Sequence, residues 1–575
     1  MRVALIYPPP WKIPSPGEPP DSRDGPPPDF SASDLDADFY QIPYGLLTLA
    51  AQARAFGHQV KVINLASYPW CDVERVAREL RADVYGLSCW TANRRGVARV
   101  ATAIRKHHRE AHITMGGPHA TPLARELLAH HAAIDSVVLG EAEATFIELL
   151  ERLENHRPLT GLAGAVVRAG RRITKGPPRP AIANLDDLAC PHRDFTSHVV
   201  MASRGCPFDC TFCAARTTWG RGYREHSVAR VLDMLELALA RVPVKILQFK
   251  DDTFTAHRSQ ALQICRGIRE RRLNFLWSCD TRADLLDDEL LRELRLAGCE
   301  RLSLGVESGS DVILKNINKR LTIAQVLEAT ELAKRYGIGV RYYVMLGNRG
   351  ETAATFAETL QFLQRARPNQ YIFSCLSIYP GTADFRDAAA AGRIDVESYS
   401  RGRFLELKMP FDAGEADARL MNDWFASHRG LRRLYQPSVD ECRAVLSRLG
   451  DHHAAHLDLA VALYRAARLE EARHHAELAL ELEHPTPGLA YNLLACIAYA
   501  RNELEQMKNL FVQAGRRDPQ HAVLVRNAQA TRRWLGRTEA GQEPLVLDPR
   551  NDFQLLERTV QPCLPGPLDA HFADW

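Results

Sequence analysis

The sequence lacks three features that would point to a membrane, to export or to nucleic acid. Its 575 residues contain no apolar run of eighteen residues, so we expect no transmembrane segment. The first seven residues suit a short strand, and they are not followed by the apolar core and cleavage site of a signal peptide. Lysine and arginine number 73 against 70 acidic residues, and the net charge of +3 predicts no nucleic-acid-binding face.

Cysteine is present, but it is not spaced like a secreted disulfide framework. The 13 cysteines are scattered through a long chain, and several lie in apolar or helical surroundings, where a free thiol behaves as a small hydrophobe. This usage predicts a reducing, cytoplasmic setting. The thiols expected to be buried are Cys89, Cys265, Cys279, Cys299, Cys375 and Cys496.

The length is too great for one hydrophobic core and predicts about three or four domains. Apolar residues make up 46% of the chain and charged residues 25%, which is ordinary for a globular protein. Changes in the pattern divide the chain into five segments. They are an α/β domain at 1–160, a linker at 161–194, a second α/β domain at 195–405, a helical region at 406–536 and an irregular tail at 537–575.

Five short apolar strands alternate with amphipathic helical stretches in the first segment. This alternation predicts a doubly wound parallel sheet with helices on both faces, whose ligand crevice lies at the carboxyl ends of the strands. The expected strands are Val3–Tyr7, Gln59–Leu65, Val84–Cys89, Ile113–Gly116 and Val137–Leu139. The candidate ligand-binding residues at the strand ends are Ser88, Trp90, Thr91, Gly116, Gly117, Pro118, His119, Gly140, Glu141 and Glu143.

Three cysteines, Cys206, Cys210 and Cys213, have the spacing C-x3-C-x2-C within the run Arg204-Gly205-Cys206-Pro207-Phe208-Asp209-Cys210-Thr211-Phe212-Cys213. Three thiolates on one loop can hold three irons of a cubane cluster and leave the fourth iron open, whereas a closed cluster takes a fourth cysteine. A zinc knuckle, which wants a fourth ligand from elsewhere, and three incidental buried cysteines are the alternatives. The motif resembles the cluster loop of the radical S-adenosylmethionine (SAM) superfamily. In that superfamily the open iron binds SAM, which is cleaved to a 5′-deoxyadenosyl radical.

The second α/β segment is similar to the partial (β/α)6 barrel of the same superfamily. Its six expected strands are Val199–Ser203, Val244–Lys250, Phe275–Cys279, Arg301–Val306, Gly339–Leu346 and Tyr371–Ile378. The resemblance implies SAM contacts at the carboxyl ends of these strands, from Phe212, Asp251, Ser278, Arg282, Glu307 and Tyr379. Each of these residues, taken alone, could equally pack the barrel or cap a helix. Asn348 and Arg349 depart from the Gly-Leu-Pro-Gly-Glu-Thr run that is usual after the fifth strand.

The first segment resembles the cobalamin-binding domain that precedes the barrel in cobalamin-dependent radical SAM enzymes. The resemblance implies that the strand-end residues named above contact cobalamin, with Gly116 and Gly117 allowing close approach of the flat corrin. Other cobalamin proteins carry Asp-x-His-x-x-Gly after the first strand, but this chain has prolines there, so no protein imidazole is expected on cobalt. We expect His119 to make hydrogen bonds within its loop instead. The alternative is that the domain keeps the fold and binds another ligand or none.

The helical region contains two units that are offset by 34–35 positions, in which Leu469, Ala472 and Pro485 correspond to Leu504, Met507 and Pro519. They resemble a degenerate tetratricopeptide pair. We expect them to pack on residues 416–434 and on the barrel, either as a structural cap or as a surface for a protein partner. The histidine pairs at 107–108, 130–131 and 452–453 are expected on solvated faces.

Taken together, the resemblance implies a 4Fe-4S cluster, SAM, cobalamin and a reductant such as flavodoxin or ferredoxin. The implied reaction is methyl transfer to an unactivated carbon of a small-molecule or peptide substrate, in the natural-product, lipid or tetrapyrrole classes. A non-methylating oxidase or cyclase, similar to the anaerobic magnesium-protoporphyrin cyclase, is the alternative enzyme. A cobalamin- or redox-sensing interaction protein is the alternative from another class.

Overall fold

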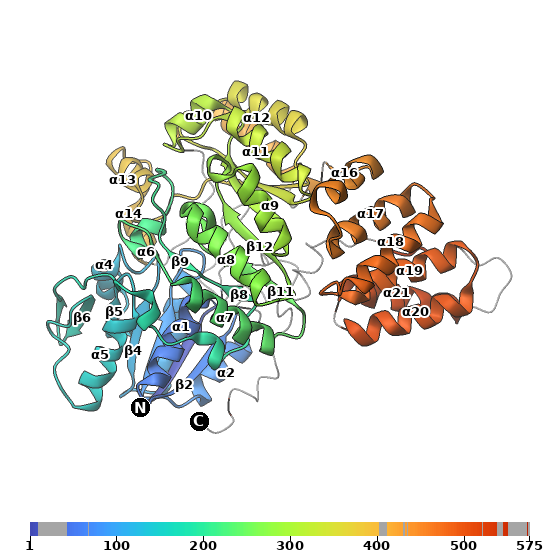
Figure 1. Ribbon diagram of the computed structural model, residues 1–575. Helices are drawn as coiled ribbons and strands as arrows, with labels where there is room; N and C mark the ends of the chain where they lie inside the picture. The colour runs from blue at the N-terminus through green and yellow to red at the C-terminus, as the bar shows by residue number, and fades with distance from the viewer. Residues whose placement is uncertain are drawn as a thin grey trace.

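The computed structural model describes residues 1–9, 43–66, 68–401, 411–428, 432–433, 435–519, 521–536, 544–549 and 572. Figure 1 shows an N-terminal α/β domain in blue to teal beside a barrel in green to yellow. A helical region in orange to red projects from the side of the barrel away from the N-terminal domain. No helix among the residues described is long and apolar enough to cross a membrane. Residues 10–42, the expected boundary at 405–406 and most of the expected tail lie outside these ranges.

The N-terminal domain is built on a seven-stranded sheet with the order β2-β1-β3-β4-β5-β6-β7, of which the first five strands are parallel. These strands are β1 (Arg2–Tyr7), β2 (Gln59–Asn64), β3 (Val84–Ser88), β4 (His112–Gly116) and β5 (Ser136–Val138), as predicted. The strand order reverses between β1 and β3, which places the ligand crevice of such a fold there. The covering helices are α1 (Tyr44–Ala55), α2 (Trp70–Glu79), α3 (Arg94–His107), α4 (Ala124–His130) and α5 (Glu143–Glu154).

Continuous apolar runs explain why this sheet is covered on both faces. All five residues of Val3–Tyr7 are at most 3% exposed, because alternate side chains enter two different cores. One core joins Ala4 and Ile6 to α2, α3 and α4, and the other joins Val3 and Leu5 to α1 and α5.

The segment expected as a linker at 161–194 is not only a linker. A hairpin of β6 (Ala165–Ala169) and β7 (Arg172–Lys175) adds to the edge of the N-terminal sheet, antiparallel to β5. Ala165, Val166 and Val167 are buried, and Gly170 turns the chain with a φ of +60°. The apolar face that these residues bury on the sheet makes them part of the domain. Two short 3₁₀ turns, η2 (Leu185–Asp187) and η3 (Pro191–Arg193), then lead to the barrel.

The barrel sheet has the order β16-β15-β14-β13-β12-β11-β8. The six predicted parallel strands are present as β8 (Val199–Val200), β11 (Ile246–Phe249), β12 (Leu276–Thr281), β13 (Cys299–Glu307), β14 (Gly339–Leu346) and β15 (Gln370–Cys375). An antiparallel strand, β16 (Arg432–Arg433), pairs with β15. A separate ribbon of β9 (Ser203–Arg204) and β10 (Arg224–Glu225) frames the segment that carries the three cysteines.

Helices follow the barrel strands and pack their apolar faces on the sheet around Phe249, Phe254 and Trp277. Several begin at a side chain that accepts from the backbone of the first turn, including Ser227, Asp287 and Thr322. The main helices are α6 (Ala215–Trp219), α7 (Val228–Arg241), α8 (Arg258–Glu270), α9 (Asp288–Leu296), α10 (Asp311–Asn316), α11 (Ile323–Arg335), α12 (Ala353–Ala366), α13 (Ala383–Ala390), α14 (Val396–Arg401) and α15 (Glu415–Ser427).

The helical region caps the amino ends of the barrel strands. Val244, Ile246 and Leu276 of the barrel share an apolar cluster with residues of α17 and α19. Its helices are α16 (Val439–Leu449), α17 (His453–Arg465), α18 (Leu469–Glu481), α19 (Pro487–Ala500), α20 (Leu504–Arg517) and α21 (Ala522–Leu535). Helices α17, α19 and α21 begin 34 and then 35 residues apart, in keeping with the repeat offset. Their assignment as tetratricopeptide units stays a prediction.

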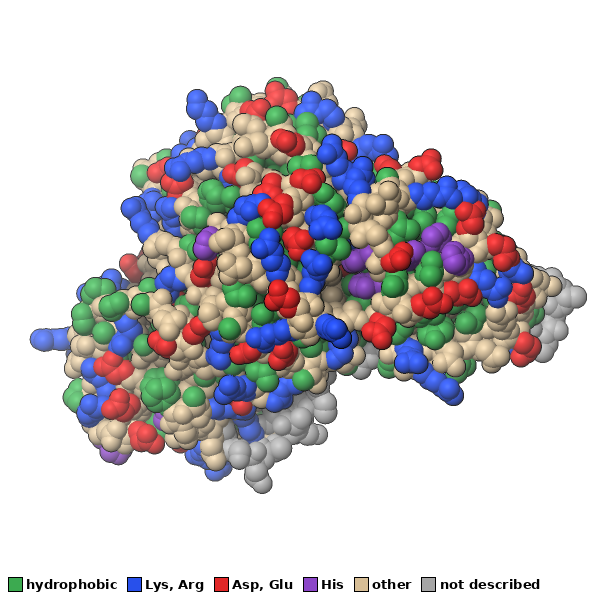
Figure 2. All heavy atoms as spheres, viewed as in Figure 1, with side chains coloured by type: hydrophobic (Ala, Val, Ile, Leu, Met, Phe, Trp, Pro, Cys, Tyr) green, Lys and Arg blue, Asp and Glu red, His purple; other side chains and the backbone are tan. Residues whose placement is uncertain are grey.

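The expectation that the histidine pair at 452–453 lies on a solvated face was wrong. His452 is buried, and His456 and His484 are buried near it, because the start of α17 turns toward the barrel. Figure 2 shows histidine side chains gathered where the barrel meets the helical region.

Candidate functional site

The three cysteines lie on a loop between β9 and β10. Cys206 and Cys210 are half-buried, Cys213 is exposed, and all three thiols are free. Gly205 opens the loop with a φ of +87°, and a Cβ there would lie 2.3 Å from the carbonyl oxygen of Gly222. The backbone before and after the loop therefore comes together only because position 205 is glycine.

Hydrogen bonds hold this cysteine loop against segments that follow the barrel strands. The Thr211 amide donates to the Ile317 carbonyl at 3.0 Å, and the Thr211 carbonyl accepts from the Asp384 amide at 3.1 Å. The Arg282 guanidinium lies 3.7 Å from the centroid of the Phe208 ring. The loop is thus fixed at the carboxyl edge of the barrel.

The donor set fits a cubane better than a single ion. Among the residues described, no group of three or more His, Cys, Asp or Glu side chains is arranged about one metal ion. In a cubane each thiolate binds a different iron, so three thiols spread over one loop suit that group. Burial raises the pKa of the half-buried Cys210, so binding of iron there must displace a proton.

Two adjacent carboxyl groups follow β11, and they face different surroundings. Asp251, predicted as a SAM contact, is 1% exposed; it accepts from the Ser203 hydroxyl and, at 3.2 Å, from the Ala202 amide. Asp252, the next residue, is exposed. Burial raises the pKa of Asp251 to about 7. Asp251 therefore braces the start of the cysteine loop, and Asp252 is the carboxyl group open to a ligand.

Glu307, at the end of β13, pairs with a lysine that the sequence motifs did not indicate. Lys319 Nζ donates to Glu307 Oε1 at 2.8 Å, and both side chains are buried. Lys319 Nζ also lies 6.0 Å from the centroid of Phe212, and its carbonyl accepts from Arg282 at 2.8 Å. Glu307 has a φ of +69°, a strained conformation that is found mainly at functional sites. Phe212, Arg282 and Glu307 are thus brought together, with Lys319 at their centre.

The other two predicted SAM contacts lie apart from this group. Ser278 is buried within β12 and its hydroxyl accepts from Arg301 at 3.4 Å. Tyr379 is 41% exposed beyond β15. No short spacing motif marks Lys319, so only its position after α10 links it to the site.

At the edge of the N-terminal sheet the predicted cobalamin contacts divide into accessible and buried residues. Trp90 is 45% exposed, and Gly116, Gly117, Pro118 and Gly140 are half-buried. The buried members are Ser88, Thr91, His119 and Glu143.

His119 makes hydrogen bonds within the protein, as expected, but to partners outside its own loop. Its Nδ1 lies 3.0 Å from the Thr91 hydroxyl and its Nε2 lies 3.1 Å from the Tyr399 carbonyl of α14. Burial, with a further contribution from Arg94, lowers the pKa of His119 to about 3, so the ring is neutral. Both ring nitrogens are engaged, which agrees with cobalt lacking an imidazole from this residue.

Gly116 and Gly117 differ in what their missing side chains make room for. A Cβ on Gly117, whose φ is +112°, would lie 2.6 Å from the Cys89 carbonyl oxygen. A Cβ on Gly116 would meet its nearest atom at 3.5 Å, an ordinary contact. Gly117 is therefore needed for the close packing of the β3 and β4 ends, independently of any corrin.

The carboxyl edges of the two sheets face each other. The Cβ position of Gly140, after β5, lies 3.3 Å from the Thr218 carbonyl of α6. That of Gly381, after β15, lies 3.2 Å from Cβ of Pro122, after β4. Glu141 and Glu143, predicted as cobalamin contacts, instead form ion pairs with Arg204 beside the cysteine loop. The two candidate ligand regions thus adjoin.

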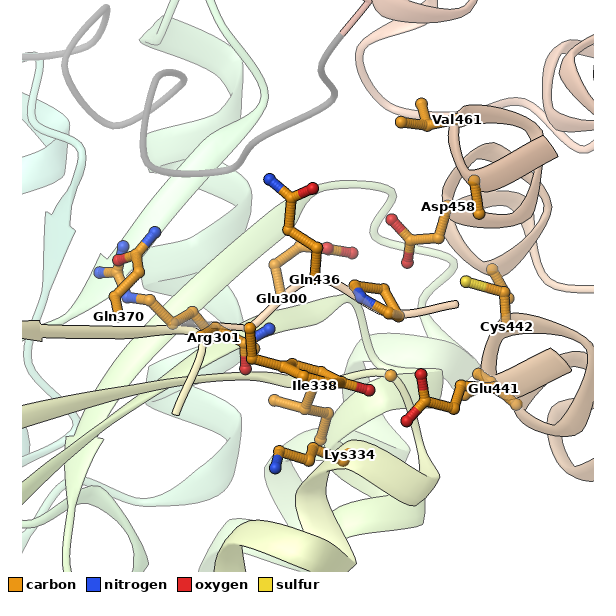
Figure 3. Close-up of a pocket in the computed structure, with 18 of the residues that line it drawn as sticks. Glu300, Arg301, Lys334, Ile338, Gln370, Gln436, Glu441, Cys442, Asp458 and Val461 are labelled. Atoms are coloured by element: carbon orange, nitrogen blue, oxygen red, sulfur yellow. The ribbon is translucent and has the colours of Figure 1, made fainter. Parts of the chain in front are cut away.

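A cavity of about 180 Å³ lies elsewhere, between the amino ends of the barrel strands and the helical region (Figure 3). Glu300, Arg301 and Gln370 enter it from the barrel, and Glu441 and Asp458 from the helical region. It is at the opposite end of the strands from the cysteine loop and is not part of this site.

Comparison with known proteins agrees with the description of both the barrel and the N-terminal domain. The family model described as the Radical SAM superfamily matches residues 200–363, and that of the B12 binding domain matches residues 35–150. An uncharacterized methyltransferase of Pyrococcus horikoshii is 30% identical over 59% of this chain and 77% of the relative. The anaerobic magnesium-protoporphyrin IX monomethyl ester cyclase of Rubrivivax gelatinosus is 26% identical over 60% of this chain and 65% of the relative.

A solved structure shares the fold. The radical SAM methyltransferase TsrM of Kitasatospora setae, with cobalamin and a 4Fe-4S cluster bound, matches 83% of this chain and 99% of its own, with a TM-score of 0.57 and 16% identity. The fold and the facing edges define an enzyme that joins a radical SAM barrel to a cobalamin-binding domain. The chain belongs to the radical SAM superfamily, in the branch that carries a B12-binding domain ahead of the barrel. The two family models imply a 4Fe-4S cluster, SAM and cobalamin as cofactors.

Proposed function

We propose that the chain moves a methyl group from SAM to an unactivated carbon of a small-molecule or peptide substrate, in the natural-product, lipid or tetrapyrrole classes. The observation that carries this proposal is the meeting of the two strand edges at Gly140 and Gly381. A substrate bound between the edges can contact both ligand regions at once. This suits a reaction in which one edge activates a carbon and the other delivers the methyl group.

Each group of residues would have its own role in this reaction. Cys206, Cys210 and Cys213 would hold three irons of the cluster, with SAM on the fourth. Asp252 would accept from the SAM ammonium, and the group around Lys319 would contact the rest of SAM through its charges. When bound, these groups would supply an electron, a 5′-deoxyadenosyl radical and a transferable methyl group, and a flavodoxin or ferredoxin would supply the electron to the cluster.

The cobalamin side would be lined by the accessible residues Trp90, Gly116, Pro118 and Gly140. Closure of the two edges over the substrate would exclude water and oxygen from the radical.

A non-methylating oxidase or cyclase is the second candidate, because the magnesium-protoporphyrin cyclase matches 60% of this chain. Product analysis separates the two. Methyl transfer leaves S-adenosylhomocysteine from one SAM and 5′-deoxyadenosine with methionine from another, whereas radical oxidation or cyclisation leaves 5′-deoxyadenosine and methionine without S-adenosylhomocysteine.

The test is anaerobic turnover of reconstituted protein with methyl-labelled SAM, a strong reductant and candidate substrates. We expect both products, and transfer of the label to substrate. The triple variant Cys206→Ala, Cys210→Ala, Cys213→Ala should lose 5′-deoxyadenosine formation. Continued 5′-deoxyadenosine formation by that variant would contradict the ligand assignment, and its formation by the native chain without S-adenosylhomocysteine would favour the second candidate.

A further inference from the structure

Four charged side chains, three of them buried, connect the N-terminal domain to the cysteine loop. Arg204 Nη1 donates to Glu141 Oε1 at 3.0 Å, and Arg204 Nη2 donates to Glu143 Oε1 at 2.6 Å. Arg224 Nη1 donates to both Glu141 oxygens, at 2.8 and 2.9 Å. We name these four residues the Glu–Arg bridge. Side-chain exposure is 6–7% for Glu141, Glu143 and Arg204 and 18% for Arg224.

The bridge holds both ends of the cysteine loop. Arg204 and Arg224 are directly opposite each other in the β9–β10 ribbon, and the three cysteines lie between them in the chain. Glu141 follows Gly140 after β5, at the candidate cobalamin edge. One carboxylate of the N-terminal domain therefore binds the residues on either side of the loop.

The charges of the Glu–Arg bridge balance, and further contacts hold its side chains in place. Two carboxylates face two guanidiniums, so removal of one member leaves an unpaired buried charge. The Trp219 ring packs 5.1 Å from the Arg204 guanidinium, and the Ile182 amide donates to Glu141 at 2.9 Å. Both oxygens of Glu141 and Oε1 of Glu143 thus accept from arginines of the β9–β10 ribbon.

We propose that the Glu–Arg bridge positions the cysteine loop relative to the cobalamin-binding domain and thereby fixes the separation of the two cofactors. Its members are positioning residues and not cobalamin contacts. This inference rests on the proposed function only in naming methyl transfer as the step that depends on the separation. Misplacement of reacting groups by ~1 Å can cost ~10²-fold in rate. A loosened bridge should therefore let SAM be cleaved while the methyl group goes untransferred.

The test compares Glu141→Gln with the matched control Glu148→Gln. Glu148 lies on α5 and also pairs with two arginines, Arg152 and Arg179, but it is away from the cysteine loop. The first readout needs no cofactor: amide hydrogen exchange of residues 205–223 in the apo protein. We expect faster exchange in Glu141→Gln and the native rate in Glu148→Gln.

The second readout is the spin–spin interaction between the reduced cluster and cob(II)alamin in the fully loaded protein. We expect it to change or broaden in Glu141→Gln alone, with about tenfold or more loss of S-adenosylhomocysteine formed per 5′-deoxyadenosine. Should Glu141→Gln not fold, Arg224→Lys keeps the charge and should give the same changes more weakly.

Three results would overturn the inference. They are unchanged exchange and spin–spin interaction in the folded variants, equal changes in Glu148→Gln, and selective loss of cobalamin binding with an unaltered loop, which would make Glu141 a cobalamin contact. A changed spin–spin interaction in a protein that forms no S-adenosylhomocysteine even in its native form would support the bridge and reject the proposed function.

Discussion

Asp251 and Asp252 are adjacent in the chain, but only Asp252 is open to a ligand. We expect Asp252→Asn to weaken SAM binding by about ten- to a hundredfold, because a charge-assisted hydrogen bond contributes roughly 1.5–3 kcal/mol. Its melting temperature should fall less than that of Asp251→Asn, because the Asp252 side chain is exposed and that of Asp251 is buried. Asp251→Asn should lower the melting temperature, since Ser203 and Ala202 lose the carboxylate that accepts from them.

Thermal unfolding with and without SAM, combined with equilibrium SAM binding, measures both effects. The two variants serve as controls for each other because they make the same chemical change one residue apart. Loss of SAM affinity in Asp251→Asn without loss of stability would reverse the assignment and restore Asp251 as the ligand contact.

At the level of single residues, the sequence predicted the features that depend on residues close together in the chain. The three cysteines are such a set, and they lie on one loop between β9 and β10. Which of two neighbouring carboxyl groups is open depends on Ser203, some fifty positions earlier, and could not be read from the pair itself. Lys319 reaches Glu307 only through the fold of β13 and α10.

The turn after β4 provides a test at the level of one element. Gly117→Ala should destabilise the N-terminal domain by about 1–3 kcal/mol, because a side chain is strained at a φ of +112° and its Cβ would overlap the Cys89 carbonyl. Gly116→Ala, one position earlier, should leave stability nearly unchanged. Chemical unfolding of the two variants measures this difference.

Of these two glycines, only Gly116 can be substituted to test cobalamin binding without destabilising the turn. A larger side chain there should weaken cobalamin binding with the domain still folded, if the corrin approaches this backbone. Equal stability of Gly117→Ala and the native chain would show that the turn relaxes, and would contradict the packing argument.

The elements themselves were largely predictable, because alternation of apolar runs and amphipathic helices is a local pattern. All five parallel strands of the first sheet and all six of the barrel were found within a few residues. The β6–β7 hairpin was missed because it adds antiparallel after the strand–helix alternation has ended. The buried histidines were missed because their helix faces the barrel, a matter of docking and not of helical periodicity.

At the level of the whole molecule, histidine rings gather between the barrel and the helical region, around the buried Arg295. His452 and His453 stack with their centroids 4.5 Å apart, and His484 lies edge-on to His453 at 5.2 Å. Burial and then Arg295 lower the pKa of His452 to about 2 and of His453 to about 4. Burial and then His453 lower the pKa of His484 well below its ordinary value.

Acid should therefore weaken this junction. The unfolded chain protonates each of these histidines near pH 6.5, but the folded chain does so only at the lowered pKa, so stability is lost as the pH falls from about 6.5 toward 4. Burial raises the pKa of Glu300 to about 7. The folded chain therefore binds one proton more readily than the unfolded chain at this residue, which stabilises the fold as the pH falls. Three histidines outweigh one carboxyl group. We expect the melting temperature to fall steadily between pH 6.5 and pH 4.5.

His452→Asn tests the origin of this effect. Asparagine can still accept from the Ala455 amide at the start of α17, so the helix keeps its cap. The unfolding free energy should depend less steeply on pH, because up to one proton fewer is taken up on unfolding. An unchanged slope in His452→Asn would locate the acid sensitivity elsewhere.

Arg295 is fully buried, and its two carboxylate partners come from distant parts of the chain, Glu300 five residues later and Asp458 163 residues later. During synthesis the barrel strands leave the ribosome long before α17 does. Through that interval the guanidinium has one partner, and the apolar floor formed by Val244, Ile246 and Leu276 is uncovered. The folding of the barrel is therefore completed only when the helical region, which follows it in the chain, covers this apolar surface.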